Sequence, residues 1–360
     1  MDAVVFSIGS FLLVLSGRVF LVFPSGVVMT CSAKLVGEKL SKFRSLFNCA
    51  ECCKAGGPID AYLLPRTDAH NNEYIAPQDE RVRFLSGFSG TNAFAIVTKS
   101  QALLWTDGRY VIQAKEEMDE GWTLMEEGTS DSISPTDWLF ENMPNESTIG
   151  FDPRLYPFDK ALKLMDTLRP IRITAVPVTP NLVDILWRDR PTEKTSKVTL
   201  LKLSECGKES AEKIKELRAS LVKKKCDSAI FTALDDIAWL MNIRGGDIPY
   251  NPLVFSILVL TPKEVHLFIN TEKLDNQDKE SFVDVVLHEY DEAAAWLKSW
   301  HNSEKEGNRM HKVLIADSTN YYLGSIIDRN YSLIAFSPVQ QMKAIKNSVE
   351  LNGMRKAHVS

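Results

Sequence analysis

The chain has 360 residues, which allows two domains of about 150 residues each and a shorter remainder. Hydrophobic residues make up 44% and charged residues 25%, and these values exclude a disordered, collagen-like or polytopic membrane protein. The formal net charge of −5 gives no general attraction to nucleic acid or anionic lipid, so we expect no nucleic-acid partner.

Residues 1–34 form an apolar leader that is interrupted by Arg18. An arginine near the middle of a spanning helix costs about 2.5–3.5 kcal/mol, and only Asp2 precedes the apolar run, where a signal peptide has basic residues. Two interpretations fit this segment. It is an extension ahead of a usual start at Met29, which leaves a cytoplasmic protein, or residues 3–31 anchor the chain in a membrane or direct its secretion.

Cys49 and Cys52 have the C-x-x-C spacing of a zinc or redox site. A zinc site needs a second pair, and none follows at a suitable spacing. Six cysteines are also too few for a disulfide scaffold in a chain of this length. We therefore expect reduced thiols.

The order of the predicted elements repeats once along the chain. Leu40, Phe43 and Phe47 recur at helical spacing, and a strand, a second helix and two strands joined by a turn follow. The expected elements of this first block are a helix through residue 47, a strand at 59–64, a helix at 78–88 and strands at 93–98 and 102–106. Those of the second block are a helix ending at 223–225, a strand at 228–232, a helix at 235–243 and strands at 254–261 and 265–270. This repetition predicts two similar α/β domains.

Strands and helices alternate after each block, which predicts mixed sheets covered by helices on both faces. The later elements are strands at 148–151, 173–178, 283–288 and 312–316 and helices at 158–168, 291–300 and 320–328. A polar stretch near Trp187–Pro191 divides the chain, so we expect a first domain at 35–190 and a second at 191–337. Residues 338–360 are expected to begin a helix whose apolar face has no later segment to pack against; its apolar residues are Val339, Met342, Ile345, Val349 and Met354.

Few residues suggest chemistry of their own. No nucleophile elbow, zinc-protease pair or phosphate loop occurs. His288 is the only histidine beside several carboxylates, and we interpret that cluster as a strand end before a helix N-terminus, where acidic residues are favourable. Arg109 follows Asp107 in a glycine turn. It is placed either to pair with Asp107 or to extend its guanidinium toward a peptide carbonyl or carboxylate, and the residues alone favour the salt bridge.

Four segments resemble the N-terminal half of cytosolic Xaa-Pro aminopeptidase (aminopeptidase P), a creatinase/prolidase-like metallopeptidase family. They are FLSGFSG at 84–90, LWTDGRY at 104–110, ALDDIAWLMNIRG at 233–245 and KAIKNSVELNGMRKAH at 343–358. The resemblance implies an α/β chain with two tandem creatinase N-terminal-like domains, followed by the first helix of a catalytic "pita-bread" domain that is otherwise missing.

The family releases an N-terminal residue that precedes proline, using two divalent metal ions, usually manganese, held by two Asp, one His and two Glu. None of those ligand positions has a counterpart here. The resemblance therefore implies a chain without catalytic residues, metal ligands or a cofactor of its own, and whether the chain is an enzyme stays open. It also implies that Arg109 contacts the peptide substrate in a full-length protein.

Three functional hypotheses follow from the resemblance. The first is a truncated isoform of an Xaa-Pro aminopeptidase that is inactive alone. The second is a non-enzymatic interaction module that forms a homodimer, or a heterodimer with the full-length enzyme. The third is that the sequence is an incomplete part of a full-length active enzyme.

Overall fold

The computed structural model describes residues 33–359 except 195 and 308–311, with side chains from residue 37 onward, and the backbone of four strands in the leader. Those strands form an antiparallel sheet: β1 (Val5–Phe6), β2 (Ser10–Leu15), β3 (Arg18–Val22) and β4 (Val28–Cys31). The leader side chains lie outside the described residues, so both interpretations of the leader stay predictions. Within the described part of the chain, every helix is too short or too polar to cross a membrane.

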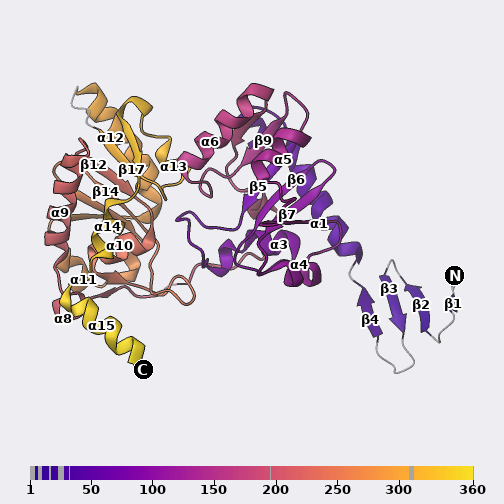
Figure 1. Ribbon diagram of the computed structural model, residues 1–360, viewed down its shortest axis with the longest axis horizontal. Coiled ribbons are helices and arrows are strands. Elements are labelled where there is room, and N and C mark those ends of the chain that lie inside the picture. The colour runs from indigo at the N-terminus through magenta and orange to yellow at the C-terminus, as the bar shows by residue number, and fades with distance from the viewer. Residues whose placement is uncertain are drawn as a thin grey trace.

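The first domain is built on a six-stranded mixed sheet in the order β10-β9-β5-β6-β7-β8 (Figure 1). Its strands are β5 (Ala61–Pro65), β6 (Phe94–Thr98), β7 (Ala102–Thr106), β8 (Thr123–Glu126), β9 (Thr148–Phe151) and β10 (Thr174–Pro177). Its helices are α1 (Ala33–Ser45), α2 (Ala50–Ala55), α3 (Arg81–Ser86), α4 (Val111–Glu117), α5 (Pro135–Asn142), α6 (Phe158–Leu168) and α7 (Leu182–Leu186).

The second domain repeats this topology in the order β18-β17-β12-β14-β15-β16. Its strands are β12 (Ser228–Phe231), β14 (Ser256–Leu260), β15 (Val265–Ile269), β16 (Val285–His288), β17 (Val313–Ala316) and β18 (Ser332–Ala335), and β11 (Thr199–Leu200) pairs separately with β13 (Ile243–Arg244). Its helices are α8 (Leu203–Cys206), α9 (Ser210–Lys223), α10 (Leu234–Met241), α11 (Asn276–Ser281), α12 (Ala293–Glu306), α13 (Tyr321–Gly324), α14 (Pro338–Ala344) and α15 (Ser348–Val359). Because each strand occupies the same place in both sheets, the predicted duplication is confirmed.

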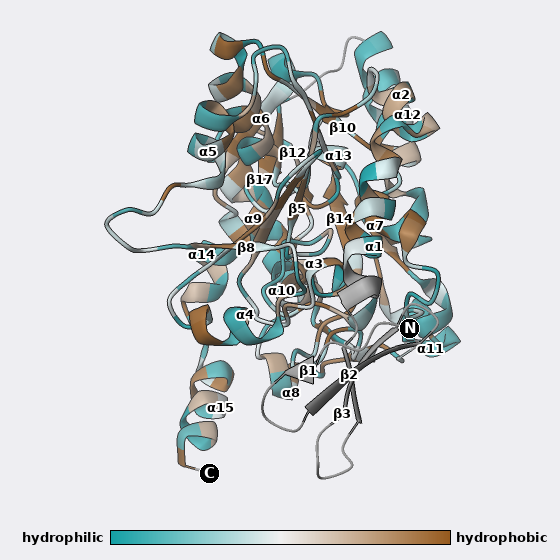
Figure 2. Cartoon of the chain, turned by 90° about the vertical axis from the view of Figure 1, so that its right-hand side faces the viewer, coloured by the Kyte–Doolittle hydropathy of each residue, from teal (hydrophilic) through white to brown (hydrophobic). Residues whose placement is uncertain are grey.

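Both faces of each sheet are covered, as expected. In β5, Tyr62 and Leu64 join one apolar cluster while Ala61 and Leu63 join another, since successive side chains of a strand point to opposite faces. In the first domain α1, α3 and α7 cover one face and α5 and α6 cover the other. The same division holds in the second domain, with α9 and α10 opposite α12 and α13. Figure 2 shows apolar residues along the strands and polar residues on the outer surfaces of the helices.

The final helical segment differs from the expectation. A single helix with an unpartnered apolar face was expected, but the chain forms α14 and α15 with a break at Ile345–Asn347. Val339 is fully buried in the core of the second domain, so the first part of the segment does have a packing partner. The break has a local cause, because Asn347 caps α15 by accepting hydrogen bonds from the backbone amides of Val349 and Glu350 at 2.9 and 3.0 Å.

Candidate functional site

Arg109 lies in the turn that connects β7 to α4. It forms a salt bridge with Asp107, which is the alternative that the sequence favours before the family resemblance is considered. Its Nε and Nη2 donate to the two carboxylate oxygens of Asp107 at 2.9 and 2.8 Å, and its backbone amide donates to the same carboxylate at 3.0 Å. The Arg109 side chain is nevertheless 63% exposed. The guanidinium is therefore held in one orientation while one of its edges faces solvent.

Residues of the preceding loop support this turn. Asn92 donates to Asp107 at 2.7 Å, and the hydroxyls of Thr91 and Tyr110 lie 2.7 Å apart. The Arg109 guanidinium lies over the Tyr110 ring, 5.1 Å from its centroid. Hydrogen bonds from Arg109 and Asn92 hold the pKa of Asp107 well below its usual range, so this carboxylate stays ionised and keeps its hold on the arginine.

The segment at 84–90 positions that loop. Helix α3 ends at Gly87 with φ of +83°, and a side chain there would bring Cβ within 2.6 Å of the Glu117 carbonyl oxygen. The backbone amide of Ser89 then donates to the Glu117 carboxylate at 2.8 Å. The two sequence segments 84–90 and 104–110 therefore form one structural unit, in which the first supports the turn that carries Arg109.

A hollow of about 510 Å³ lies beside Arg109. Its charged and amide-bearing lining residues are Arg66, Asn71, Asn72, Glu73, Asn92, Arg109, Glu127 and Lys160. Arg109 uses Nε and Nη2 for Asp107, and Nη1 makes no hydrogen bond to another residue in the described part of the chain. A guanidinium with unused donors is suited to a carbonyl or carboxylate oxygen of a peptide.

The two domains meet through His70, a residue that sequence reasoning did not single out. His70 is buried, with its Nδ1 2.8 Å from the Thr232 carbonyl oxygen and its Nε2 2.8 Å from the Tyr290 hydroxyl. Burial lowers the pKa of His70, which favours the neutral ring. Tyr290 is 220 residues away in the sequence, so no spacing pattern pointed to this pair.

Backbone contacts reinforce the junction between the domains. The amide of Phe158 donates to the Thr319 carbonyl at 2.8 Å, and the amide of Tyr321 donates to the Tyr156 carbonyl at 2.7 Å. The Asn320 side chain donates to the Ala69 carbonyl at 2.8 Å. Each domain donates to the other in these bonds. They hold the first domain, which carries Arg109, against the second domain, to which α15 is attached.

A smaller cavity of about 260 Å³ lies at this junction and is lined by ionisable groups. Arg81 donates to Asp184 at 2.8 and 3.1 Å and to Asp79 at 2.8 Å. Burial raises the pKa of Asp79 to about 6 in spite of Arg81. Arg190 also pairs with Asp184 at 2.8 Å, so the network ties α3, α7 and the segment between the domains together. We interpret it as structural.

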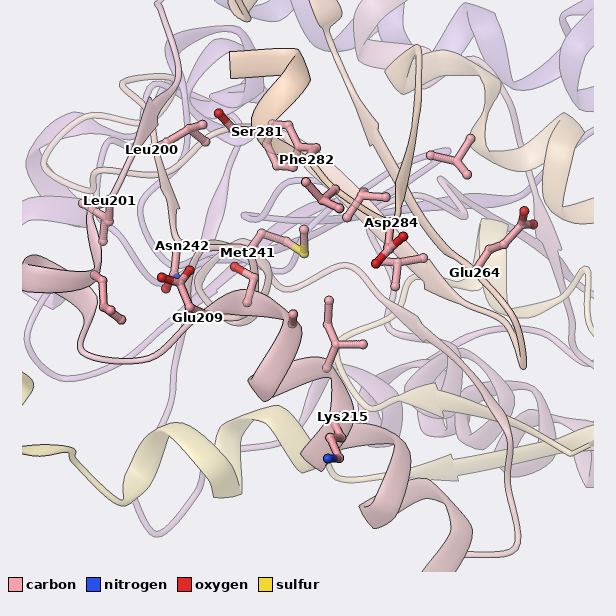
Figure 3. A pocket seen from close by; sticks show the side chains of 18 of the residues that line it. Leu200, Leu201, Glu209, Lys215, Met241, Asn242, Glu264, Ser281, Phe282 and Asp284 are labelled. Atoms are coloured by element: carbon pink, nitrogen blue, oxygen red, sulfur yellow. The ribbon is translucent and has the colours of Figure 1, made fainter. Parts of the chain in front are cut away.

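A further hollow, of about 1020 Å³, belongs to the second domain alone. Figure 3 shows side chains entering it from α9, including Lys215, and from the segment with Ser281 and Phe282 on the opposite side. The Ser281 hydroxyl donates to the Gln277 carbonyl at 2.8 Å, and within the described part of the chain it makes no hydrogen bond to a side-chain base. The hollow therefore lacks the arrangement of an activated nucleophile.

His288 does not form a site with its neighbouring carboxylates. Its Nε2 lies 3.0 Å from Nδ1 of His266, and its ring stacks on Phe268 with centroids 4.6 Å apart. Burial and the neighbouring His288 lower the pKa of His266 to about 4.

The metal ions that the resemblance implies require a group of ligating side chains around each ion. Across residues 37–359, with the gaps already given, no group of three or more His, Cys, Asp or Glu side chains is arranged to hold a metal ion. The metal ions therefore do not fit this part of the chain.

The start of α15 is attached to the second domain. The Trp239 indole donates to Glu350 at 2.8 Å, and the Asn347 side chain donates to the Cys206 carbonyl at 2.8 Å. Beyond Glu350 the helix projects away from the domain (Figure 1), and its side chains are exposed, with Leu351 at 40% and Met354 at 47%.

Comparisons with known proteins agree with this architecture. Two models of the Creatinase/Prolidase N-terminal domain match the chain in tandem, at residues 50–186 and 189–350. The chain is 45% identical over 327 residues to Xaa-Pro aminopeptidase app-1 of Caenorhabditis elegans, covering 89% of this chain and 53% of the relative. It is 36% identical over 325 residues to Xaa-Pro aminopeptidase ApepP of Drosophila melanogaster, covering 89% and 52%.

A solved structure of X-prolyl aminopeptidase from C. elegans, described as a cytosolic enzyme with a di-nuclear active site, superimposes with a TM-score of 0.87 at 44% identity. The match covers 90% of this chain and 53% of that chain. The chain thus spans about half the length of the relatives it matches.

Proposed function

Because the chain belongs to the Creatinase/Prolidase N-terminal domain family and resembles aminopeptidase P, we propose that it supplies the two substrate-shaping domains of an Xaa-Pro aminopeptidase. The substrates are peptides with proline in the second position. The observation that carries the proposal is the fixed, exposed guanidinium of Arg109, which keeps unused donors beside a hollow of about 510 Å³.

We assign the first domain to residues 35–190, the second to 191–337 and the beginning of the metallopeptidase domain to 338–360. The tandem family matches support the division near residue 190. The second match extends to residue 350 and Val339 is buried in the core of the second domain, so that core continues into α14, and the break at 345–347 separates α15 from it. A cytosolic location is supported by the description of the C. elegans enzyme. In this proposal hydrolysis depends on metal ligands that another part of the enzyme supplies, and the chain alone is inactive.

Arg109 contacts a carbonyl or carboxylate of the bound peptide. The test joins this chain to the metallopeptidase half of the C. elegans relative and compares Arg109→Ala with the unaltered fusion. A charged hydrogen bond contributes about 1.5–3 kcal/mol, so kcat/KM for an Xaa-Pro peptide should fall by about 10- to 160-fold. Arg172→Ala is the matched control, because Arg172 is also exposed and pairs with a single carboxylate, Glu146. An unchanged kcat/KM in Arg109→Ala excludes the substrate contact.

The second candidate function is an interaction module that forms a homodimer, or a heterodimer with the full-length enzyme. The exposed apolar side chains of α15 favour it, including Leu351, Met354 and Val359. Size-exclusion chromatography with light scattering tests it. A monomer that also fails to associate with full-length enzyme removes this candidate.

A further inference from the structure

Three cysteines lie close together where the first helical region ends. Cys49 immediately precedes α2, Cys52 is the third residue of that helix, and Cys53 follows. All three are free thiols. The function proposed above uses none of them.

Cys49 and Cys52 are within reach of one another. Their sulfur atoms are 3.6 Å apart, and the Cys52 thiol also donates a hydrogen bond to the Leu46 carbonyl oxygen, at 3.5 Å. Residues three apart in a helix have Cα atoms about 5 Å apart, which is inside the range of about 4.4–6.8 Å that a disulfide spans. Rotation of the two side chains is therefore sufficient to join them.

The two thiols differ in their access to solvent. Cys52 is fully buried in the core of the first domain, while Cys49 is half-buried at its edge. Burial and the neighbouring Cys49 raise the pKa of Cys52 to about 12, so the Cys52 thiol stays protonated until Cys49 has been oxidised. Of these two thiols, Cys49 is the one that an external oxidant reaches first. Cys53 is exposed, and its sulfur is directed to the Asn48 carbonyl, 3.9 Å away.

We propose that Cys49 and Cys52 form a reversible thiol–disulfide switch that a peroxide oxidises. The Cys49 sulfur attacks one peroxide oxygen, the O–O bond breaks, and Cys49 becomes a sulfenic acid while one water leaves with the thiol proton. The Cys52 sulfur then attacks the Cys49 sulfur, its proton departs with the sulfenic hydroxyl as a second water, and the disulfide forms. In total, the two thiols lose two electrons to one peroxide. A dithiol reductant reverses the change, because thiol–disulfide exchange reduces the protein disulfide and oxidises the reductant to its own disulfide.

The test treats the whole purified chain with hydrogen peroxide under native conditions, alkylates the remaining thiols and identifies them by tandem mass spectrometry. Trypsin cleavage after Arg44 and Lys54 releases one peptide that contains all three cysteines. The expected product carries a link between Cys49 and Cys52 and one alkyl group, on Cys53. A dithiol reductant should restore three alkylated cysteines.

Three variants separate the roles of the sulfurs. Cys53→Ser should keep the link, and Cys49→Ser should lose it. Cys52→Ser should accumulate a sulfenic acid at Cys49 that dimedone traps. If Cys52→Ser does not fold, the tryptic peptide of the unaltered chain still shows whether Cys49 and Cys52 are linked. Oxidation of Cys53 alone, or a link that involves Cys53 in place of Cys52, overturns the proposal.

Discussion

The imidazole Nε2 of His70, in the first domain, lies 2.8 Å from the hydroxyl of Tyr290 in the second. The other ring nitrogen lies 2.8 Å from the carbonyl oxygen of Thr232. One buried side chain thus satisfies two polar groups of the neighbouring domain, and it helps to fix the domain that carries Arg109 against the domain to which α15 is attached.

Replacing His70 with alanine should destabilise the junction. The change removes two hydrogen bonds and leaves the Tyr290 hydroxyl and the Thr232 carbonyl without their partner, so we expect the free energy of unfolding to fall by about 2–4 kcal/mol. Urea unfolding followed by tryptophan fluorescence measures this. His358→Ala is the control, since His358 is exposed and its one hydrogen bond among the described residues is to the Met354 carbonyl of its own helix. A loss no larger than that of the control would show that His70 does not couple the domains.

Acid should weaken the second domain through the His266–His288 pair. The pKa of His266 is lowered from 6.5 to about 4, so the unfolded chain binds a proton at a higher pH than the folded chain does. The stability that the neutral ring contributes is complete above about pH 6.5 and is lost toward pH 4, by up to about 3 kcal/mol. His288, Glu264 and Trp296 are the groups that face this ring.

Unfolding free energies measured at several pH values test this prediction. His266→Gln should show a shallower loss of stability between pH 6.5 and 4 than the unaltered chain, although His70 and His301 still titrate with lowered pKa values. Equal slopes in the two proteins would contradict the assignment.

Lys273 holds a buried carboxylate in the second domain. Its side chain is 1% exposed and donates to Asp247 at 2.8 Å and to Glu193 at 2.5 Å, while the Asp247 side chain is fully buried. Lys273→Met should cost about 3–5 kcal/mol, because Asp247 is left buried without its cation. Lys305→Met removes an exposed pair with Asp328 and should cost less than about 1 kcal/mol. Thermal unfolding compares the two, and similar losses would argue against the buried pair.

Asn347 stabilises the first turn of α15. Asn347→Ala removes the cap and the bond to the Cys206 carbonyl, so the first turn of α15 should lose about 1 kcal/mol or more of local stability. Hydrogen exchange of the α15 amides measures it, and faster exchange is expected. Asn352→Ala is the control on the same helix, where the side chain contacts only Arg355 among the described residues. Unchanged exchange in Asn347→Ala would show that the attachment of α15 does not depend on the cap.

Local pattern predicted much of the fold. The strand at 148–151 and the helix at 158–168 coincide with β9 and α6, because their apolar residues follow the strand and helix periods closely. The edge strands β8 and β18 were not predicted, since their half-buried residues lack a clear alternating pattern. The helix expected at 320–328 ends at Gly324, where a side chain would lie within 2.6 Å of the Phe158 ring of the other domain.

The candidate site was predictable only in part. The turn with Asp107 and Arg109 was visible in the sequence because the two residues are adjacent to a glycine turn. Its support from Thr91 and Asn92, and the contact between His70 and Tyr290, depend on pairing between distant segments, and no local spacing indicates such contacts.

The most direct test of the account is a hydrolysis assay on the purified chain alone. It is incubated with a peptide that has proline in the second position, with manganese and without metal, and release of the N-terminal residue is measured. We predict no release above the metal-free control, because the described residues hold no set of metal ligands. Release that requires manganese and stops when a chelator is added would contradict the proposal that this chain shapes a substrate site without performing the hydrolysis itself.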